Sequence, residues 1–227
     1  MKALIVEDNA DVVEAVSLCL QLRWPDIDIA VAEVGVQGVE IARARPLDIV
    51  ILDINLPDID GFEVLRRVRT FSTVPTIILT VRGKEEDQAR GLEMGADDYI
   101  VKPFRPRDFI ARVTAVLRRS TKPPESTTEP SIARGTLEFN LRTNEARLKN
   151  DIVRLTPTEG RLLYALMRSP EETISNQRLL QEVWGREDVT ADTLRTRIRR
   201  LRDKLNDNPN RIILTERGEG YRFVSPA

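Results

Sequence analysis

The chain of 227 residues contains no histidine, and cysteine occurs once, as Cys19. Without histidine, neither a Ser-His-Asp nor a Cys-His catalytic arrangement can be built from this chain, and a His-ligated zinc site is excluded too. A single cysteine excludes an intrachain disulfide and a thiolate cluster for a metal. We expect Cys19 to be a small buried apolar residue. If phosphorylated histidine matters for this protein, it has to lie on another one.

Long apolar runs are also missing. No uncharged apolar stretch approaches the ~20 residues that a membrane-spanning helix needs. The N-terminal sequence becomes acidic at Glu7 and Asp8, too early for a signal peptide. We therefore expect a protein of the reducing cytoplasm that has no membrane partner.

Neither sign of charge is in excess, since 35 basic and 36 acidic residues nearly cancel. The two halves differ, however: residues 1–120 carry 16 basic and 20 acidic side chains, whereas residues 121–227 carry 19 and 16. Between them lies a segment with three prolines and no apolar periodicity. We predict domains over 1–119 and 133–227, joined by a linker over 120–132. The alternative, a loop of that length within one compact domain, is uncommon.

Short apolar runs alternate with amphipathic stretches in the N-terminal half. Two runs, Ile49–Leu52 and Ile77–Leu79, are apolar on both faces, as central strands of a parallel sheet are. Five strands alternating with five helices predict a doubly wound α/β fold. The expected strands are Ala3–Val6, Ile29–Val31, Ile49–Leu52, Thr76–Leu79 and Tyr99–Val101, and the expected helices cover about 10–20, 35–45, 61–70, 84–94 and 105–119.

Polar side chains follow four of these strands, at the carboxyl ends where functional groups gather in such a sheet. They are Glu7, Asp8, Asp53, Thr80 and Lys102. Neighbouring carboxylates repel one another unless a cation neutralises them, and three acids suit Mg²⁺, which takes hard oxygen ligands. A lysine and a threonine hydroxyl beside the metal can hold the oxygens of a phosphoryl group. The pattern predicts attack by Asp53 on a phosphodonor to give an acyl phosphate.

Each of these residues alone has a simpler explanation. Asp8 could cap the following helix, and Asp53 could start a turn before Pro57. The occurrence of all five polar residues at the right strand ends favours the phosphoryl site.

The same residues lie in motifs that resemble the receiver domains of bacterial response regulators. The motifs agree in order and spacing and cover about residues 1–119; they are Leu4–Asp8, Ile51–Gly61, Pro75–Thr80 and Gly95–Phe104. The resemblance implies a CheY-like fold and phosphorylation of Asp53 by a histidine kinase.

The receiver resemblance also implies roles for individual residues. Mg²⁺ would be held by Glu7, Asp8, Asp53 and the backbone carbonyl of Asn55. Lys102 would contact the phosphoryl group, and Thr80 and Tyr99 would form the switch pair. The phosphorylated protein would form a symmetric homodimer through its fourth helix, fifth strand and fifth helix. Asp98, Asp108 and Arg112 are the candidates for its ion pairs.

The C-terminal half has a different pattern. Alternating stretches at Thr136–Asn140, Glu145–Lys149 and Ile152–Leu155 predict a small antiparallel sheet. A helix begins near Thr156 and Pro157, and further helices are expected over about 175–183 and 191–205. A β-hairpin follows, from Arg211–Thr215 to Tyr221–Val224, with Arg217 near its tip.

The helix expected over 191–205 is rich in arginine. Leu194, Ile198, Leu201 and Leu205 form one apolar stripe, and six basic side chains stand against Asp203 in the last three turns. A solvated face is the simpler explanation, but such faces normally mix charge signs. An arginine-rich helix has the right shape for a major groove and the right charge for phosphates.

Further motifs resemble the winged-helix effector domain of OmpR/PhoB-type regulators over about 133–225. They are Leu155–Glu159, Val183–Gly185, Ile198–Leu205 and Arg217–Phe223. The resemblance implies a recognition helix near 191–205, a wing near 211–224, and a loop around Trp184–Thr190 that contacts DNA or RNA polymerase. The family often has acidic and histidine side chains at the positions of Arg195 and Arg197.

We predict how the recognition helix divides its DNA contacts. Arg200, with Thr196 on the same side, is expected to read a guanine edge. Phosphate contacts are expected from Thr193, Arg197, Arg199 and Arg202, and a minor-groove contact from Arg217.

The sequence therefore predicts a two-domain transcription factor, not an enzyme, that is controlled by phosphorylation and binds double-stranded promoter DNA. One alternative is an atypical regulator of the same architecture that acts without phosphorylation. An aspartyl-phosphate phosphohydrolase is another, but such enzymes commonly need a second acid where Asn55 stands. A purely structural DNA-binding protein would leave the acidic cluster without a purpose.

Overall fold

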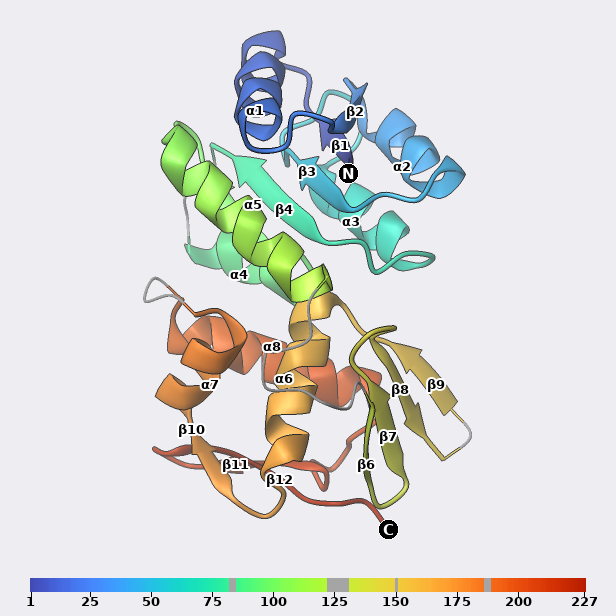
Figure 1. The fold of residues 1–227 in the computed structure, drawn as a ribbon, viewed down its shortest axis with the longest axis vertical. Helices are drawn as coiled ribbons and strands as arrows, with labels where there is room; N and C mark the ends of the chain where they lie inside the picture. Colours follow the sequence, from blue (N-terminus) through green and yellow to red (C-terminus); the bar gives the residue numbers. More distant parts are fainter. Residues whose placement is uncertain (82–84, 122–130, 150, 186–188) are drawn as a thin grey trace. The chain divides into compact units, whose positions relative to one another are not determined.

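The computed structural model describes residues 1–81, 85–121, 131–149, 151–185 and 189–227 (Figure 1). The chain forms two compact units, Met1–Arg118 and Arg119–Ala227. No helix of the described residues is long and apolar enough to cross a membrane.

The N-terminal unit is built on a parallel sheet with the strand order β2-β1-β3-β4-β5. The strands are β1 (Lys2–Val6), β2 (Asp28–Ala32), β3 (Ile49–Leu52), β4 (Thr76–Thr80) and β5 (Asp98–Val101). The helices are α1 (Ala10–Arg23), α2 (Gly35–Ala44), α3 (Gly61–Arg69), α4 (Glu85–Glu93) and α5 (Pro106–Thr121). The predicted doubly wound α/β fold is confirmed, with every expected strand and helix of this half present.

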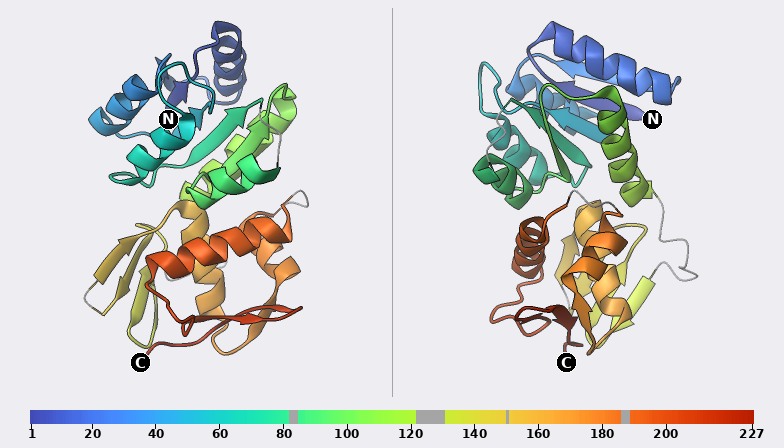
Figure 2. Two further views of the ribbon diagram at one scale, coloured as in Figure 1. Left: turned by 180° about the vertical axis from the view of Figure 1, so that it is seen from behind. Right: turned by 90° about the vertical axis from the view of Figure 1, so that its left-hand side faces the viewer.

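The two faces of this sheet carry separate cores, because side chains alternate along each strand. Val50 and Leu52 of β3 pack on one face with side chains from α2 and α3. Ile49 and Ile51 pack on the other with side chains from α1 and α5, and Figure 2 shows these helix layers from two further directions. Cys19 is buried in this second core, as the sequence predicts for a small apolar residue.

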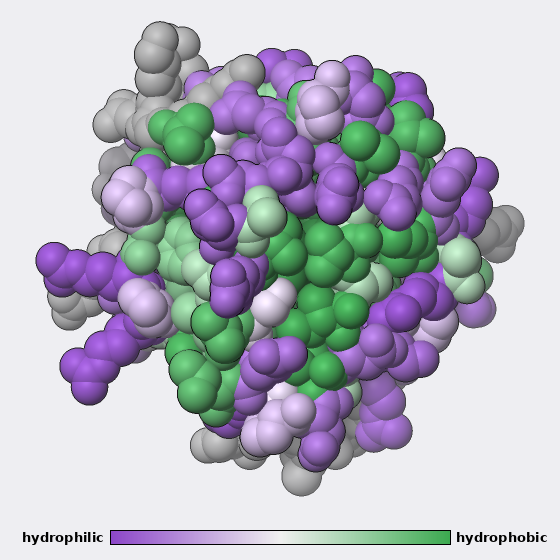
Figure 3. Space-filling view, turned by 90° about the horizontal axis from the view of Figure 1, so that it is seen from above, coloured by the Kyte–Doolittle hydropathy of each residue, from purple (hydrophilic) through white to green (hydrophobic). Residues whose placement is uncertain are grey.

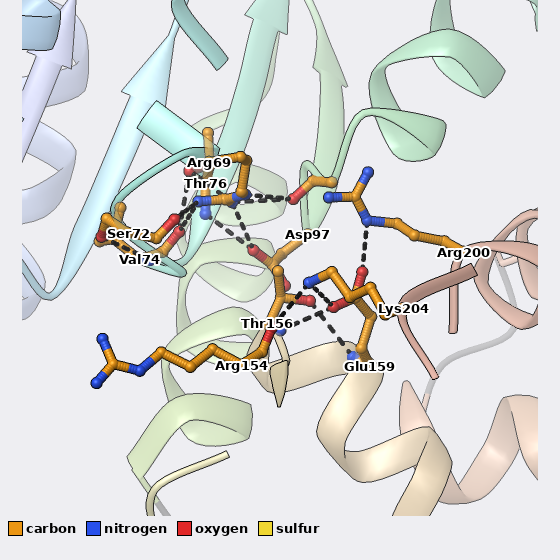
Figure 4. Close-up of polar contacts among 11 residues, drawn as sticks. Arg69, Ser72, Val74, Thr76, Asp97, Arg154, Thr156, Glu159, Arg200 and Lys204 are labelled. Carbon is orange, nitrogen blue, oxygen red and sulfur yellow. Dashed lines mark hydrogen bonds and ion pairs between the residues drawn. The ribbon is translucent and has the colours of Figure 1, made fainter. Parts of the chain in front are cut away.

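Arg69, at the end of α3, ties the amino-terminal edge of the sheet together (Figure 4). Its guanidinium donates to the backbone carbonyls of Val74 and Gly95, at 2.8 and 2.9 Å, and to the Thr76 hydroxyl at 3.0 Å. The Asp97 carboxylate, which accepts from the backbone N–H of Thr76, lies 3.6 Å from Arg69. These bonds fix the starts of β4 and β5, and the site described below lies at the opposite ends of the strands.

The C-terminal unit contains two antiparallel sheets and three described helices. The first sheet has the order β6-β7-β8-β9, with strands Ser131–Arg134, Leu137–Asn140, Glu145–Leu148 and Asp151–Arg154. The second has the order β10-β12-β11, with strands Thr173–Ser175, Gly220–Phe223 and Ile213–Glu216. The helices are α6 (Pro157–Arg168), α7 (Asn176–Val183) and α8 (Ala191–Lys204).

Two strands of this unit are absent from the sequence prediction. β6 begins at Ser131, inside the segment expected as linker. None of its four residues is buried, so its sequence has no apolar alternation strong enough to predict a strand. β10 has three residues and a single buried one, Ile174, which pairs with Tyr221 across 47 positions of the chain. Such short strands are defined by their partners and not by local alternation.

The three helices of the C-terminal unit enclose its core. α6 begins with a capping box between Thr156 and Glu159, with Pro157 in its first turn as predicted. Leu194, Ile198, Leu201 and Leu205 are all buried. The predicted apolar stripe of α8 is therefore confirmed as the side that packs on the rest of the unit.

Candidate functional site

Three carboxylates meet at the carboxyl edge of the N-terminal sheet. Glu7 and Asp8 follow β1, and Asp53 follows β3; these strands are neighbours, with Val6 opposite Leu52. One oxygen from each carboxylate lies within 4.8 Å of the others. Glu7 and Asp53 are buried, whereas Asp8 is exposed. The strand pairing thus brings together the three acids that the sequence singled out.

The Asp53 carboxylate is held on both of its oxygens. Oδ1 accepts from the backbone N–H groups of Ile54, at 2.6 Å, and Asn55, at 3.1 Å. Oδ2 accepts from the ammonium group of Lys102 at 2.8 Å, and Lys102 also donates to Glu7 Oε2 at 2.5 Å. The simple turn role considered for Asp53 is therefore present, together with the contact to Lys102.

The start of α3 presses against the backbone of Asp53. A Cβ atom on Gly61 would lie 2.1 Å from the Asp53 carbonyl oxygen, so this position admits glycine alone without a shift of the backbone. The Gly61 N–H donates to the Ile54 carbonyl at 2.9 Å. These contacts fix the loop that presents Asp53.

Asp8 is not the cap of α1. Asn9 occupies the N-cap position, and its side-chain oxygen accepts from the backbone N–H groups of Asp11 and Val12. The simpler explanation for Asp8 is therefore wrong, and its carboxylate stays available to the acidic cluster.

The acidic cluster fits a hard divalent cation. Burial raises the pKa of Glu7, and the negative charge of Asp53 adds to that effect, while the hydrogen bond from Lys102 opposes it. A cation among the three carboxylates would relieve both the burial and the repulsion. The oxygen donors are of the kind that Mg²⁺ or Ca²⁺ accepts.

Thr80 and Tyr99 lie on neighbouring strands. Thr80 ends β4 and is fully buried, and Tyr99 of β5 is buried opposite Ile78. Asp98 forms an ion pair with Arg112 of α5 at 3.1 Å, within the same chain, and Asp108 is exposed in the first turn of that helix. The structure thus joins two of the three candidates for dimer ion pairs to each other.

An open cleft of about 860 Å³ runs from the carboxylates along α1. Its lining includes Lys102, Phe104 and the exposed side chains of Leu18 and Leu22. Figure 3 looks down on the N-terminal unit and shows apolar side chains gathered across the middle of that view. The cleft therefore has the acidic residues Glu7, Asp8 and Asp53 at one end and apolar side chains along α1.

The expected DNA contacts of α8 and the hairpin fall into two groups. Arg199 and Arg217 are exposed, and Thr193 and Thr196 are half-buried, so their contacts with DNA remain predictions. Arg197 is 0% exposed, and the prediction that it meets a phosphate is wrong. Its position, three residues after Leu194 and four before Leu201, places it in the apolar stripe.

Trp184 also differs from expectation. It is 2% exposed and belongs to the core of the C-terminal unit, so a direct contact of its side chain with DNA or polymerase is contradicted. A large aromatic side chain at the end of α7 stabilises more by burial than by exposure. The rest of the predicted contact loop includes residues 186–188, which lie outside the described residues.

Arg200 is directed toward α6 (Figure 4). Its Nε donates to Glu159 Oε1 at 2.5 Å, and Lys204 donates to Glu159 Oε2 at 2.7 Å. In this structure Arg200 therefore does not face outward as a base-reading side chain. The partner lies 41 residues away in the sequence, and no local spacing indicates it.

Glu159 is fully buried at the centre of this group. Burial alone would raise its pKa, but the positive charges of Lys204 and Arg200 and the hydrogen bond from the Thr156 N–H outweigh burial and lower the pKa to about 2. Sequence reasoning did not single out Glu159 beyond its place in a helix start. A glutamate three residues after a capping threonine is the signal that finds its cap role.

Arg202 contacts the hairpin instead of presenting itself to a phosphate. Its Nη2 donates to the Ile213 carbonyl at 2.6 Å and to the Thr215 hydroxyl at 2.8 Å. Arg202 is half-buried against β11, and this position conflicts with the phosphate contact expected for it.

Comparisons with known proteins cover both units. Residues 3–114 match the response regulator receiver domain, and residues 149–223 match the C-terminal domain of transcriptional regulatory proteins. The transcriptional regulatory protein AfsQ1 of Streptomyces coelicolor is 39% identical over 227 residues, which are 98% of each chain. The DNA-binding response regulator MtrA of Mycobacterium tuberculosis is 36% identical over 99% of this chain and 97% of its own.

A solved structure agrees with these matches. DrrB of Thermotoga maritima, described as an OmpR/PhoB homolog, covers 99% of both chains with a TM-score of 0.51 and 28% identity. The chain thus has a receiver domain followed by a transcriptional regulatory domain, and it matches these relatives along nearly their whole length. Both observations point to one family. The chain belongs to the OmpR/PhoB-type response regulators of two-component signalling systems.

Proposed function

We propose that this protein accepts a phosphoryl group on Asp53 from a histidine kinase and then binds specific promoter DNA as a homodimer. In this proposal the receiver spans 1–119, the linker 120–132 and the winged-helix effector domain 133–227. The observation that carries the proposal is the buried Asp53 carboxylate, held by Lys102 and accompanied by Glu7 and Asp8 at the carboxyl edge of the sheet.

Transfer begins with attack by an Asp53 carboxylate oxygen on the phosphorus atom. The new bond is an acyl phosphate O–P bond, and the bond that breaks joins phosphorus to the imidazole nitrogen of the kinase. The Lys102 ammonium group donates to Asp53 Oδ2, so it is close enough to donate to the phosphoryl oxygens once the new bond has formed. Mg²⁺, held by Glu7, Asp8, Asp53 and the Asn55 carbonyl, would neutralise the remaining charge.

The phosphoryl group then biases a two-state equilibrium in the receiver. It adds negative charge and acceptor oxygens where a carboxylate stood. We assign the response to Thr80, which can donate its hydroxyl to those oxygens, and to Tyr99, which can move into the space that Thr80 leaves. A bias of a few kcal/mol is enough to change which state predominates.

In the effector domain, α8 is the recognition helix and the β11–β12 hairpin is the wing. Thr193, Thr196, Arg199 and Arg217 remain our candidates for DNA contacts, and the loop after Trp184 for a contact with RNA polymerase. Because promoter DNA is the proposed target, we propose that the protein acts in the cytoplasm, where the bacterial chromosome lies.

Asn55 argues against the competing phosphohydrolase activity. It stands two residues after Asp53, where aspartyl-phosphate hydrolases commonly carry a second acid. An amide cannot act there as a general acid or base. We propose that the protein is a phosphoacceptor and not an enzyme with turnover on phosphate esters.

The test of phosphorylation is incubation of the full chain with acetyl phosphate, with Mg²⁺ or with a chelator. We expect one base-labile phosphoryl group per chain when Mg²⁺ is present and very little after chelation, because the acidic cluster then repels the donor. Intact-mass spectrometry measures the stoichiometry. Equal labelling under both conditions would contradict the assigned metal site, and no labelling in either would favour a regulator that acts without phosphorylation.

The dimer is tested by an Arg112→Glu variant. This change removes the ion pair with Asp98 and places two carboxylates together on the proposed α4–β5–α5 face. We expect the phosphorylated variant to stay monomeric at concentrations where the phosphorylated wild type dimerises, as measured by analytical ultracentrifugation. Arg66→Glu, which reverses a charge on α3, serves as the matched control. Dimerisation of Arg112→Glu as readily as wild type would show that the interface lies elsewhere.

A further inference from the structure

The six basic side chains of α8 do not share one face. Four of them are engaged inside the C-terminal unit. Arg197 is fully buried, Arg200 and Lys204 donate to the buried Glu159 carboxylate, and Arg202 donates to the carbonyl of Ile213. These four side chains position the helix, and the basic side chains of α8 that are exposed are Arg195 and Arg199.

The remaining two, Arg195 and Arg199, lie on the outer face of α8. Arg195 has 74% of its side chain exposed, and Arg199 is exposed as well. A separation of four residues puts them one above the other on the helix surface. Arg195 stands in the N-terminal half of α8, the half from which recognition helices contact base edges, and Arg199 lies about one turn further along the helix.

Acidic side chains bound this arginine pair at both ends. Asp192, three residues before Arg195, and Asp203, four residues after Arg199, are both exposed. Carboxylates on this stripe oppose close approach to phosphates, so the stripe suits the floor of a groove better than its walls. Asp192 also accepts an ion pair from Arg195 at 2.9 Å. Because both partners are so exposed, the ion pair contributes little free energy, and Arg195 can leave it to make another contact.

We infer that Arg195 and Arg199 are the base-reading residues of this protein and that each binds a guanine in the major groove. This inference rests on the proposed DNA-binding function and deepens it. A planar guanidinium donates two hydrogen bonds to O6 and N7 of guanine, the commonest specific contact of this kind. Four residues of helix rise about 6 Å, and base pairs stack about 3.4 Å apart. Each half-site therefore carries two G·C pairs about two base pairs apart.

A change of base preference tests the inference, because a glutamine side chain forms the equivalent pair of hydrogen bonds with adenine. Sites are first selected from random DNA with the phosphorylated full-length wild type, and their guanines are then replaced one at a time by adenine. We expect each replacement to weaken wild-type binding about 10-fold. Arg199→Gln is expected to bind better when adenine replaces one of the two guanines, and Arg195→Gln when adenine replaces the other.

The control is Arg142→Gln, which removes the same charge from an exposed turn between β7 and β8 and is expected to keep the wild-type preference. Glutamine is a good helix former, and thermal unfolding of each variant verifies the fold. Unchanged preference in both α8 variants, or an equal loss of affinity for every base, overturns the inference while leaving DNA binding in place. A wild type that selects no DNA at all overturns the proposed function as well.

Discussion

An Asp53→Asn protein is expected to take up no phosphoryl group from acetyl phosphate with Mg²⁺, under conditions where the wild type takes up one. The amide fills the same space but carries no negative charge, so it neither attacks phosphorus nor completes the set of carboxylates for a cation. The backbone bonds that the carboxylate Oδ1 accepts can pass to the amide oxygen, so the loop is expected to keep its shape. Intact-mass spectrometry checks the result.

Two further variants show what the loss means. Asp26→Asn removes an exposed carboxylate in the turn before β2 and is expected to label like the wild type. Lys102→Ala leaves the nucleophile in place but removes the ammonium group from Asp53 and Glu7, and we expect slower labelling with the site intact. Labelling of Asp53→Asn at the wild-type stoichiometry would show that another residue carries the phosphoryl group.

Glu159→Gln is expected to lower the free energy of unfolding of the C-terminal unit by about 3 kcal/mol at pH 7. The glutamine keeps the volume but leaves Arg200 and Lys204 facing a neutral amide in a buried setting. Denaturant unfolding in a Trp24→Phe background measures this unit separately, because Trp184 is then the sole tryptophan. Glu145→Gln breaks an exposed ion pair with Arg154 and is the matched control, with an expected change below about 1 kcal/mol.

The same variant has a characteristic pH dependence. The pKa of Glu159 falls from an ordinary 4.5 to about 2 on folding. A lowered pKa stabilises the folded state fully above about pH 5, and that contribution declines as the pH falls toward 2. The difference between wild type and Glu159→Gln is therefore expected to shrink between pH 5 and pH 2. A difference that stays constant over this range would mean that Glu159 acts through packing and not through charge.

Much of the N-terminal unit follows from local sequence. Ile49–Leu52 is apolar on both faces, and this alone predicts a central parallel strand. The strand ends then predict which polar side chains meet, because adjacent parallel strands end at one edge. The sequence does not predict the side-chain hydrogen bonds of the site. It also does not predict that Asn9 and not Asp8 caps α1, because both residue types favour the N-cap position.

The arginines of α8 show where local pattern stops. The periodicity of the leucines was enough to place Arg197 among them, yet a charged residue type suggested exposure. The direction of Arg200 depends on Glu159, and that of Arg202 on β11, and neither partner lies near in sequence. A helical stripe thus indicates which side is buried, whereas the roles of individual cations depend on tertiary partners.

Because α8 is held in place, we expect the DNA and not the protein to change shape when the two bind. Glu159 fixes the helix to α6, and Arg202 fixes it to the hairpin, so the spacing between helix and wing is set before any ligand arrives. A reader with preset spacing loses little conformational entropy on association. With Arg217 as the proposed minor-groove contact, we expect the protein to favour operators whose duplex readily bends or narrows its minor groove. We therefore expect base steps that no side chain contacts to contribute to the choice of promoter through their stiffness.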